Sequence, residues 1–238
     1  AQGGGRKLLE ALEVREDALA PGDEQRPIGL QEVALGVDVD EHEQGINEPY
    51  YFAPAAEPMH DYITPWQRDF QTQIGKNHAQ YFDANGWLYF TKEVFDLFYP
   101  SYGDTYPMYN GSIGMTYEQA GGPRGGRAIV NDVQDTLTLH DRIAHHLTTS
   151  LSTIETTSKN ASKVVENFRQ YYQRSTAQPP GSYKTFVIRD ANDPNKINTL
   201  CSLLDRHQIR YGRAGNSLSG VKAFDYATGK EVSVTINS

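Results

Sequence analysis

Apolar and polar residues alternate in the sequence IGMTYE, where Ile113, Met115 and Tyr117 take every second position. This period of two predicts a β-strand with one buried face. The predicted strand ends at Glu118, and the sequence GGP at 121–123 then interrupts it. Enzymes with α/β folds place catalytic groups at strand ends beside glycine loops, so Glu118 is a candidate catalytic carboxylate. A solvated glutamate at a strand end is the alternative interpretation.

Three further patterns predict the elements around this strand. The sequence VALGVDVD at 33–40 is typical of a buried strand. A helix is predicted over 64–82, with Thr64 as a favoured N-cap residue and a proline at the first helical position, and His78 is expected on its surface. A long helical stretch is predicted over 136–173 from one stripe of apolar residues. The stripe consists of Leu139, Ile143, Leu147, Leu151 and Ile154, spaced by four, four, four and three positions.

The composition changes along the chain and predicts a division into parts. Residues 1–32 are rich in Ala, Gly, Glu, Arg and Leu, and no aromatic residue occurs before Tyr50. Within them, residues 6–14 have the apolar spacing of two or three helical turns, and a charged loop follows. We expect residues 1–32 to form a weakly ordered leader and residues 33–175 to form the main domain.

The sequence STAQPPGS at 175–182 predicts a linker to a small C-terminal region. We expect residues 183–238 to form a small α/β domain with a strand, a helix, a second strand and a hairpin. These elements are expected over 184–189, 195–206, 208–213, 221–226 and 231–236. The predicted fold class of the whole chain is therefore α/β.

The charge and cysteine content of the 238 residues exclude several classes of protein. The net charge of −8 disfavours binding to nucleic-acid phosphates or to anionic membranes. Cys201 is the only cysteine, which excludes an intrachain disulfide and a zinc site built from cysteines. No apolar run approaches the roughly 20 residues of a membrane span, and residues 1–30 lack the apolar core of a signal peptide.

His42 lies in an acidic sequence, DEHEQG, immediately after the predicted strand at 33–40. A neutral imidazole is a good zinc ligand, and neighbouring carboxylates can fix its tautomer. His42 is therefore a candidate metal ligand, with a surface histidine in an acidic loop as the alternative. The adjacent residues His145 and His146 face different directions on a helix, which disfavours a metal site formed by both.

Three segments together resemble the C-terminal half of the zinc carboxypeptidases of the carboxypeptidase A superfamily. The sequence DEHEQG at 40–45 is similar to the strand end that supplies the last zinc-binding histidine. The sequence YPSYGD at 99–104 is similar to the mobile tyrosine loop, and MTYE at 115–118 is similar to the strand that ends in the catalytic glutamate. The helix after Thr136 is similar to the closing helix of the family. The resemblance extends over residues 37–173.

This resemblance implies a zinc metallocarboxypeptidase that hydrolyses peptides. In the family, zinc polarises the scissile carbonyl and lowers the pKa of its bound water, and a glutamate passes the proton of that water to the leaving amine. The resemblance gives His42 the role of zinc ligand, Glu118 that of general base, and Tyr99 that of the residue that closes over the substrate. Tyr102 is the second candidate for the tyrosine, and Asp104 is expected beside it at the substrate.

The chain departs from the family pattern at several positions. None of its seven histidines is followed by Glu three residues later, so the first zinc motif, His-x-x-Glu, is absent, and so is the Asn-Arg pair that binds the substrate carboxylate. Position 41 is Glu where the family tends to have an aromatic residue. One histidine cannot hold a catalytic zinc, which takes about three protein ligands. We therefore expect an incomplete, inactive piece of a secreted or periplasmic bacterial peptidase, with zinc binding by this chain alone in doubt.

The expected fold is a partial carboxypeptidase-like mixed sheet with flanking helices, followed by a small βαβ-hairpin region. Because the family draws strands from both halves of its domain, such a piece would expose sheet edges. We expect marginal stability, a homodimer that covers the edge, or association with the N-terminal half. The alternative function is a non-catalytic module that binds a peptide or glycan by stacking on the tyrosine-rich loop at 98–117. A third alternative is that these tyrosines belong to the core.

Overall fold

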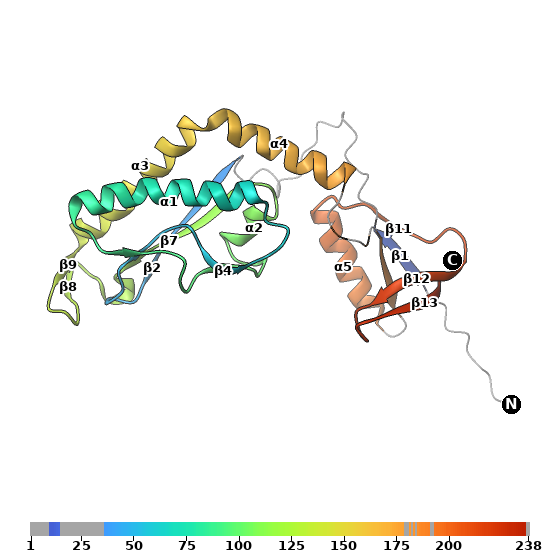
Figure 1. Ribbon diagram of the computed structural model, residues 1–238. Helices are drawn as coiled ribbons and strands as arrows, with labels where there is room; N and C mark the ends of the chain where they lie inside the picture. The colour runs from blue at the N-terminus through green and yellow to red at the C-terminus, as the bar shows by residue number, and fades with distance from the viewer. Residues whose placement is uncertain are drawn as a thin grey trace. The chain divides into compact units, whose positions relative to one another are not determined.

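The computed structural model places helices and strands in two compact units (Figure 1). One unit is Glu32–Tyr172, and the other combines Ala1–Gln31 with Gln173–Ser238. The structure describes residues 10–14, 36–178, 181, 183, 185–190 and 193–236. Both units contain helices and β-sheet, so the predicted α/β class is confirmed.

A four-stranded sheet forms the centre of the first unit. Its strands lie in the order β2 (Val37–Gln44), β7 (Ile113–Ala120), β3 (Tyr50–Tyr51) and β5 (Tyr89–Phe90). β2 pairs with β7 in parallel, whereas β3 pairs with β7 antiparallel, so the sheet is mixed. β2 forms one edge of this sheet.

The two long strands continue further than their sequences indicated. β2 and β7 pair residue by residue, from Val37 opposite Ile113 to Gln44 opposite Ala120. The prediction that the strands end at Asp40 and Glu118 is therefore wrong. The ladder continues because each backbone satisfies the hydrogen-bonding groups of the other, whatever the polarity of the side chains.

The side chains of β2 alternate between two environments, as the pleat of a strand requires. Glu41 and Glu43 face helix α3 (Leu139–Lys159), where Glu41 accepts a hydrogen bond from the Ser150 hydroxyl and Glu43 pairs with Arg142. Helix α1 (Pro65–Asn85) also lies on this side of the sheet (Figure 1). The even-numbered residues of β2 face the opposite side, which leaves them available to a pocket.

Helix α1 confirms the helix predicted near 64–82. Thr64 and Gln67 form a capping box at its start, and Gly86 ends it in the left-handed conformation with φ of 68°. The expectation that His78 lies on the helix surface is wrong, because this side chain is fully buried. Its Nε2 atom lies 2.9 Å from the hydroxyl of Tyr117, within an aromatic core.

Helix α3 ends at Lys159, and after Asn160 the chain continues as α4 (Ala161–Ala177). The predicted helical stretch over 136–173 is thus two helices, and its start is wrong, because Thr136–Thr138 form strand β9. Helix α4 also continues past residue 175, so the predicted linker at 175–182 begins inside a helix. The apolar stripe of α3 is exposed, while the face of α3 that packs on the sheet is polar.

Short elements complete the first unit. They are β4 (Ala56–Met59), β6 (Asp96–Leu97), α2 (Thr105–Met108), the 3-10 helix Gly122–Arg124, β8 (Ala128–Val130) and β9 (Thr136–Thr138). β4 pairs with β6, and β8 pairs with β9. Across the described part of the chain, no helix is both long and apolar enough to cross a membrane.

The second unit contains the predicted strand, helix, strand and hairpin. They are β10 (Phe186–Asp190), α5 (Pro194–Arg206), β11 (Tyr211–Arg213), β12 (Leu218–Asp225) and β13 (Lys230–Ile236). β1 (Glu10–Val14) lies between β10 and β11 and pairs antiparallel with both. The helical turns expected over 6–14 are therefore wrong for the part described, because pairing on both sides of the strand overrides local helical spacing. The rest of the predicted leader lies outside the described residues.

Candidate functional site

A pocket of about 380 Å³ lies over the even-numbered face of β2 and β7. The two strands contribute Asp40 and His42, and Thr116 and Glu118. The remaining lining residues come from two segments, one at the start of β6 and one before α2, and are Val94, Phe95, Asp96, Tyr102, Gly103 and Asp104. Four of the five predicted site residues therefore line one cavity, although they are far apart in the sequence.

The register of β2 and β7 explains why His42 and Glu118 meet. The two residues are paired across the parallel ladder, so their side chains project from the same face. The Nδ1 atom of His42 lies 3.7 Å from Oε1 of Glu118. The Nε2 atom of the same ring lies 3.0 Å from Oδ1 of Asp40. Both ring nitrogens thus face carboxylates, one from β2 itself and one from β7, and the imidazole is more than half exposed.

Glu118 is buried, and one of its two carboxylate oxygens has no hydrogen-bond donor among the described residues. Its residue is 7% exposed, and its Oε2 atom has no hydrogen-bond partner among the described residues. Burial raises the pKa of Glu118, His42 acts in the opposite direction, and the negative charges of Asp40 and Asp104 raise it further. A carboxylate in such surroundings binds a proton more readily than an ordinary glutamate, which is the property required of a general base.

Asp104 fixes the tyrosine-containing loop to the sheet. Its two carboxylate oxygens accept hydrogen bonds from the hydroxyls of Thr116 at 2.9 Å and Thr105 at 3.0 Å. Burial raises the pKa of Asp104. The loop backbone lies so close to β7 that a Cβ atom on Gly114 would stand 1.8 Å from the carbonyl oxygen of Asp104. Asp104 therefore lines the pocket and also anchors one of its walls.

The two candidate tyrosines occupy different positions. Tyr102 lines the pocket, whereas Tyr99 lies outside the lining and packs edge-on against the ring of Tyr102, with 5.7 Å between the ring centres. Both rings are more than half exposed. The structure thus brings Tyr102, the second candidate, into the cavity with Glu118, and leaves Tyr99 beside it.

The residues of the pocket do not form the ligand set of a catalytic zinc. No group of three or more His, Cys, Asp or Glu side chains among the described residues is arranged to hold a metal ion. His42 is the one histidine of the pocket, and both of its ring nitrogens face carboxylates. Catalytic zinc takes three protein ligands and an open position. We therefore derive no reaction step through a metal in this site.

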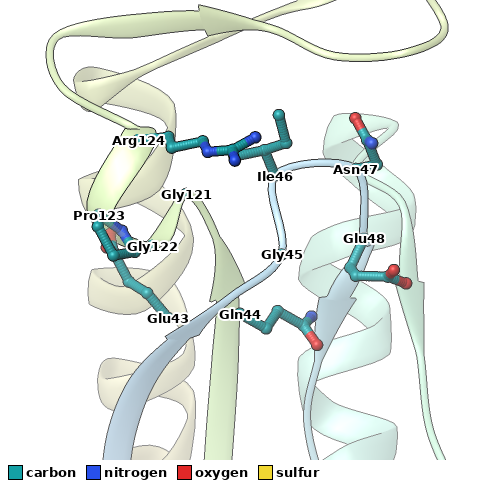
Figure 2. Close-up of a pocket in the computed structure, with 10 residues that line it drawn as sticks. All are labelled: Glu43, Gln44, Gly45, Ile46, Asn47, Glu48, Gly121, Gly122, Pro123 and Arg124. Atoms are coloured by element: carbon teal, nitrogen blue, oxygen red, sulfur yellow. The ribbon is translucent and has the colours of Figure 1, made fainter.

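A second pocket, of about 550 Å³, lies past the carboxyl ends of β2 and β7 and was not predicted. Figure 2 shows Arg124, from the 3-10 helix after β7, extending toward Ile46 in the loop after β2. Behind these loops, buried Arg142 holds Glu43 at 2.5 Å and donates to the Gly126 carbonyl. A Cβ atom on Gly125 would stand 2.5 Å from this guanidinium. A buried arginine, Arg142, thus fixes the glycine-rich loop at 121–126. The glycine pattern of this loop in the sequence did not indicate such an anchor.

Two further carboxylates of the first pocket, Asp40 and Asp96, were not predicted from the sequence. Asp40 could have been found, because it precedes His42 by two positions and a strand places such residues on one face. Asp96 comes from the distant strand β6, and no local pattern indicated it. No family model, curated protein or solved structure matches this chain. The function is therefore inferred from the chemistry of the pocket itself.

Proposed function

We propose that this pocket carries the proton-transfer part of a peptidase site of the zinc carboxypeptidase type. The observation that supports the proposal is the state of Glu118, which is buried, lacks a hydrogen bond at Oε2 and faces His42 across paired strands. A buried carboxylate oxygen that is left without a hydrogen bond destabilises a fold by about 1–3 kcal/mol. Such groups with raised pKa values are concentrated at functional sites.

The proposed role of Glu118 is to take a proton from a water molecule and to deliver it to the leaving amine nitrogen of a peptide. Tyr102 contacts the substrate from the pocket wall, and Asp104 holds the loop that carries this tyrosine. The polarisable imidazole of His42 lies beside the base, with its Nδ1 atom 3.7 Å from Oε1 of Glu118. In the resembled family zinc activates the water, and the described residues here provide one imidazole. We therefore propose that this chain alone binds peptide without turning it over.

The charge of the pocket indicates which peptides it would bind. Four of its lining residues are carboxylic acids, Asp40, Asp96, Asp104 and Glu118, and the described lining contains no Lys or Arg. Complementary charge favours association and disfavours ligands of the same sign. We therefore propose peptides with a basic terminal side chain as ligands, in preference to peptides that end in Asp or Glu.

Calorimetric titration with short peptides that end in Lys, Leu or Glu tests this function. We expect the Lys-ending peptide to bind about tenfold more tightly than the Leu-ending peptide at low salt, and the Glu-ending peptide to bind least. Tyr102→Ala should weaken binding, whereas Tyr62→Ala, an exposed tyrosine outside the pocket, should not. Equal binding of all three peptides would contradict the proposed ligand class.

Metal analysis of the purified chain, combined with a hydrolysis assay, tests the incomplete site. We expect less than one zinc ion per chain and no release of terminal amino acids. Stoichiometric, tightly bound zinc together with turnover would contradict the proposal that the site is incomplete. In that case Glu118→Gln should abolish turnover without removing the metal, and turnover that survives this change would overturn the role of Glu118.

A second candidate function is a non-catalytic module that binds peptides or glycans by stacking. It is favoured by the two neighbouring tyrosines Tyr99 and Tyr102, whose rings are both more than half exposed on one loop. Aromatic faces that lie beside one another at a surface are suited to flat apolar groups. Binding that survives Glu118→Gln but is lost in Tyr99→Ala would favour this function over the first.

A further inference from the structure

Helix α3 exposes its most apolar residues. An apolar stripe on a helix ordinarily faces a core, and a large exposed apolar patch marks an interaction surface. The exposed fractions are 43% for Leu139, 56% for Ile143, 56% for Leu147, 56% for Leu151 and 63% for Ile154. We call these five residues the α3 stripe. In a domain with a closed core, an amphipathic helix would bury such a stripe.

Hydrogen bonds on the opposite face fix this orientation. Thr149 lies 2.9 Å from the hydroxyl of Tyr50, and Ser152 lies 2.7 Å from Nδ1 of His78. Nδ1 of His145 lies 2.6 Å from the side-chain oxygen of Gln119. All of these groups are buried, so rotating α3 to bury its apolar stripe would leave several polar groups unpaired. The stripe is therefore a stable outer surface of the unit.

We propose that the α3 stripe is the contact surface of a homodimer, in which α3 packs antiparallel against α3 of a second copy. A two-fold axis requires a surface that is complementary to itself. The stripe has this property if the axis passes at Leu147. Ile143 lies four residues before Leu147 and Leu151 lies four residues after it, so Ile143 of one copy faces Leu151 of the other. Leu139 lies eight residues before Leu147, and Ile154 lies seven residues after it. Each residue of one copy thus meets an apolar residue of the other.

The area of the stripe and the residues beside it fit a second copy of this chain. Covering these side chains in two copies removes on the order of 1,000 Å² from water, about the lower limit of a specific interface. The groove lined by Val37, Val39 and Ile154 adjoins the stripe and adds apolar area. Beside the stripe lie half-buried neutral residues such as Ala144 and Thr148, and the neighbouring acid Glu155 is paired with Lys159 at 2.5 Å. Two copies can therefore approach here despite the net charge of −8 on each chain.

The free edge of β2 is a less suitable contact between two copies. β2 forms the edge of its sheet and carries four acids, Asp38, Asp40, Glu41 and Glu43. Antiparallel pairing of two such strands would place carboxylates opposite carboxylates, which is destabilising. The geometry thus points to α3, and it does so independently of the role proposed for Glu118.

Sedimentation analysis over a range of concentrations tests the dimer. We expect a concentration-dependent dimer, and we expect Leu147→Lys to raise its dissociation constant by about 100-fold or more, because both copies lose a buried leucine at the axis. Leu88→Lys is the matched control, since Leu88 is 78% exposed and lies outside the stripe. A monomer at all concentrations, or a dimer unaffected by Leu147→Lys, would overturn the proposal. Circular dichroism checks that each variant is folded.

Cysteine cross-linking tests the antiparallel register. In a Cys201→Ser background, Leu147→Cys should form a disulfide between two copies on mild oxidation. Leu139→Cys should not cross-link to itself, because two such positions would lie about 24 Å apart along the helices, far beyond disulfide reach. It should cross-link when mixed with Ile154→Cys. Self-cross-linking at position 139, or none at position 147, would contradict the arrangement.

Discussion

At the scale of single residues, the pairing of His42 with Glu118 shows how a site arises from register. Neither side chain has a neighbour in its own sequence that would indicate the other. The parallel ladder of β2 and β7 places them opposite each other, and burial then raises the pKa of Glu118. The chemistry of the pair therefore depends on the fold at least as much as on residue type.

Replacing Glu118 by Gln should stabilise the protein above the raised pKa of this residue. Between the ordinary pKa of Glu and the raised value, the folded protein holds a proton that the unfolded chain releases, so stability falls as the pH rises through this window. We expect Glu118→Gln to gain about 1 kcal/mol or more in the free energy of unfolding at about pH 8. The gain should vanish near pH 4. Urea unfolding at both pH values measures it.

The control for this prediction is Glu48→Gln, which alters an exposed glutamate. It should leave the free energy of unfolding nearly unchanged at both pH values. A loss of stability in Glu118→Gln near pH 8 would show that both carboxylate oxygens are paired in solution, and would contradict a buried Oε2 atom without a hydrogen bond.

Buried histidines should make the protein sensitive to mild acid. Burial lowers the pKa of His78 to about 3 and that of His145 to about 4. Below about pH 6.5 these two residues bind protons in the unfolded chain but stay neutral in the folded state, so stability falls as the pH decreases. Between its pKa in the folded state and its pKa in the unfolded chain, each histidine lowers the free energy of unfolding by about 1.4 kcal/mol per unit decrease in pH.

Urea unfolding between about pH 7 and pH 5 measures this slope. We expect His145→Asn to reduce it, and His140→Gln, which changes an exposed histidine, to leave it unaltered. A slope that does not change in His145→Asn would show that another group causes the loss of stability in acid.

At the scale of elements, β7 and the tyrosine loop depend on a close backbone approach. Gly114 lies inside a strand, where alanine is ordinarily favoured by about 0.5–1 kcal/mol. Here a Cβ atom would meet the Asp104 carbonyl oxygen at 1.8 Å. We expect Gly114→Ala to destabilise the protein by about 2–4 kcal/mol and to weaken peptide binding through displacement of Tyr102.

Chemical denaturation and peptide titration measure these two effects of Gly114→Ala. The control is Gly212→Ala in β11, because a Cβ atom there would have no neighbour within 4 Å. A Gly114→Ala variant as stable as the parent would contradict the close packing of the loop on β7.

At the scale of the whole molecule, the stability of the chain should depend on its concentration. If copies associate through the α3 stripe, mass action stabilises the folded state as the concentration increases. We expect the melting temperature to rise by about 2–4 °C for a tenfold increase in concentration. Differential scanning calorimetry should show this rise in the parent chain and not in Leu147→Lys. A melting temperature independent of concentration would contradict the association.

The sequence by itself determined the class of the fold, the start of helix α1 and four of the residues that line the pocket. Thr64 and the following proline indicate a helix start by local chemistry, so the helix could be predicted. The alternation of Ile113, Met115 and Tyr117 indicated a strand for the same reason. The residue types of His42 and Glu118 marked them as candidates before any geometry was known.

Only the tertiary structure decided how these parts meet. The register of β2 and β7 placed His42 against Glu118, and the loop packing brought Tyr102 into the pocket in preference to Tyr99. The orientation of α3 was also decided there, because its polar side found hydrogen-bond partners on other elements and its apolar stripe remained outside. Periodicity indicates that a helix has two faces. Which face turns inward depends on partners that are distant in the sequence.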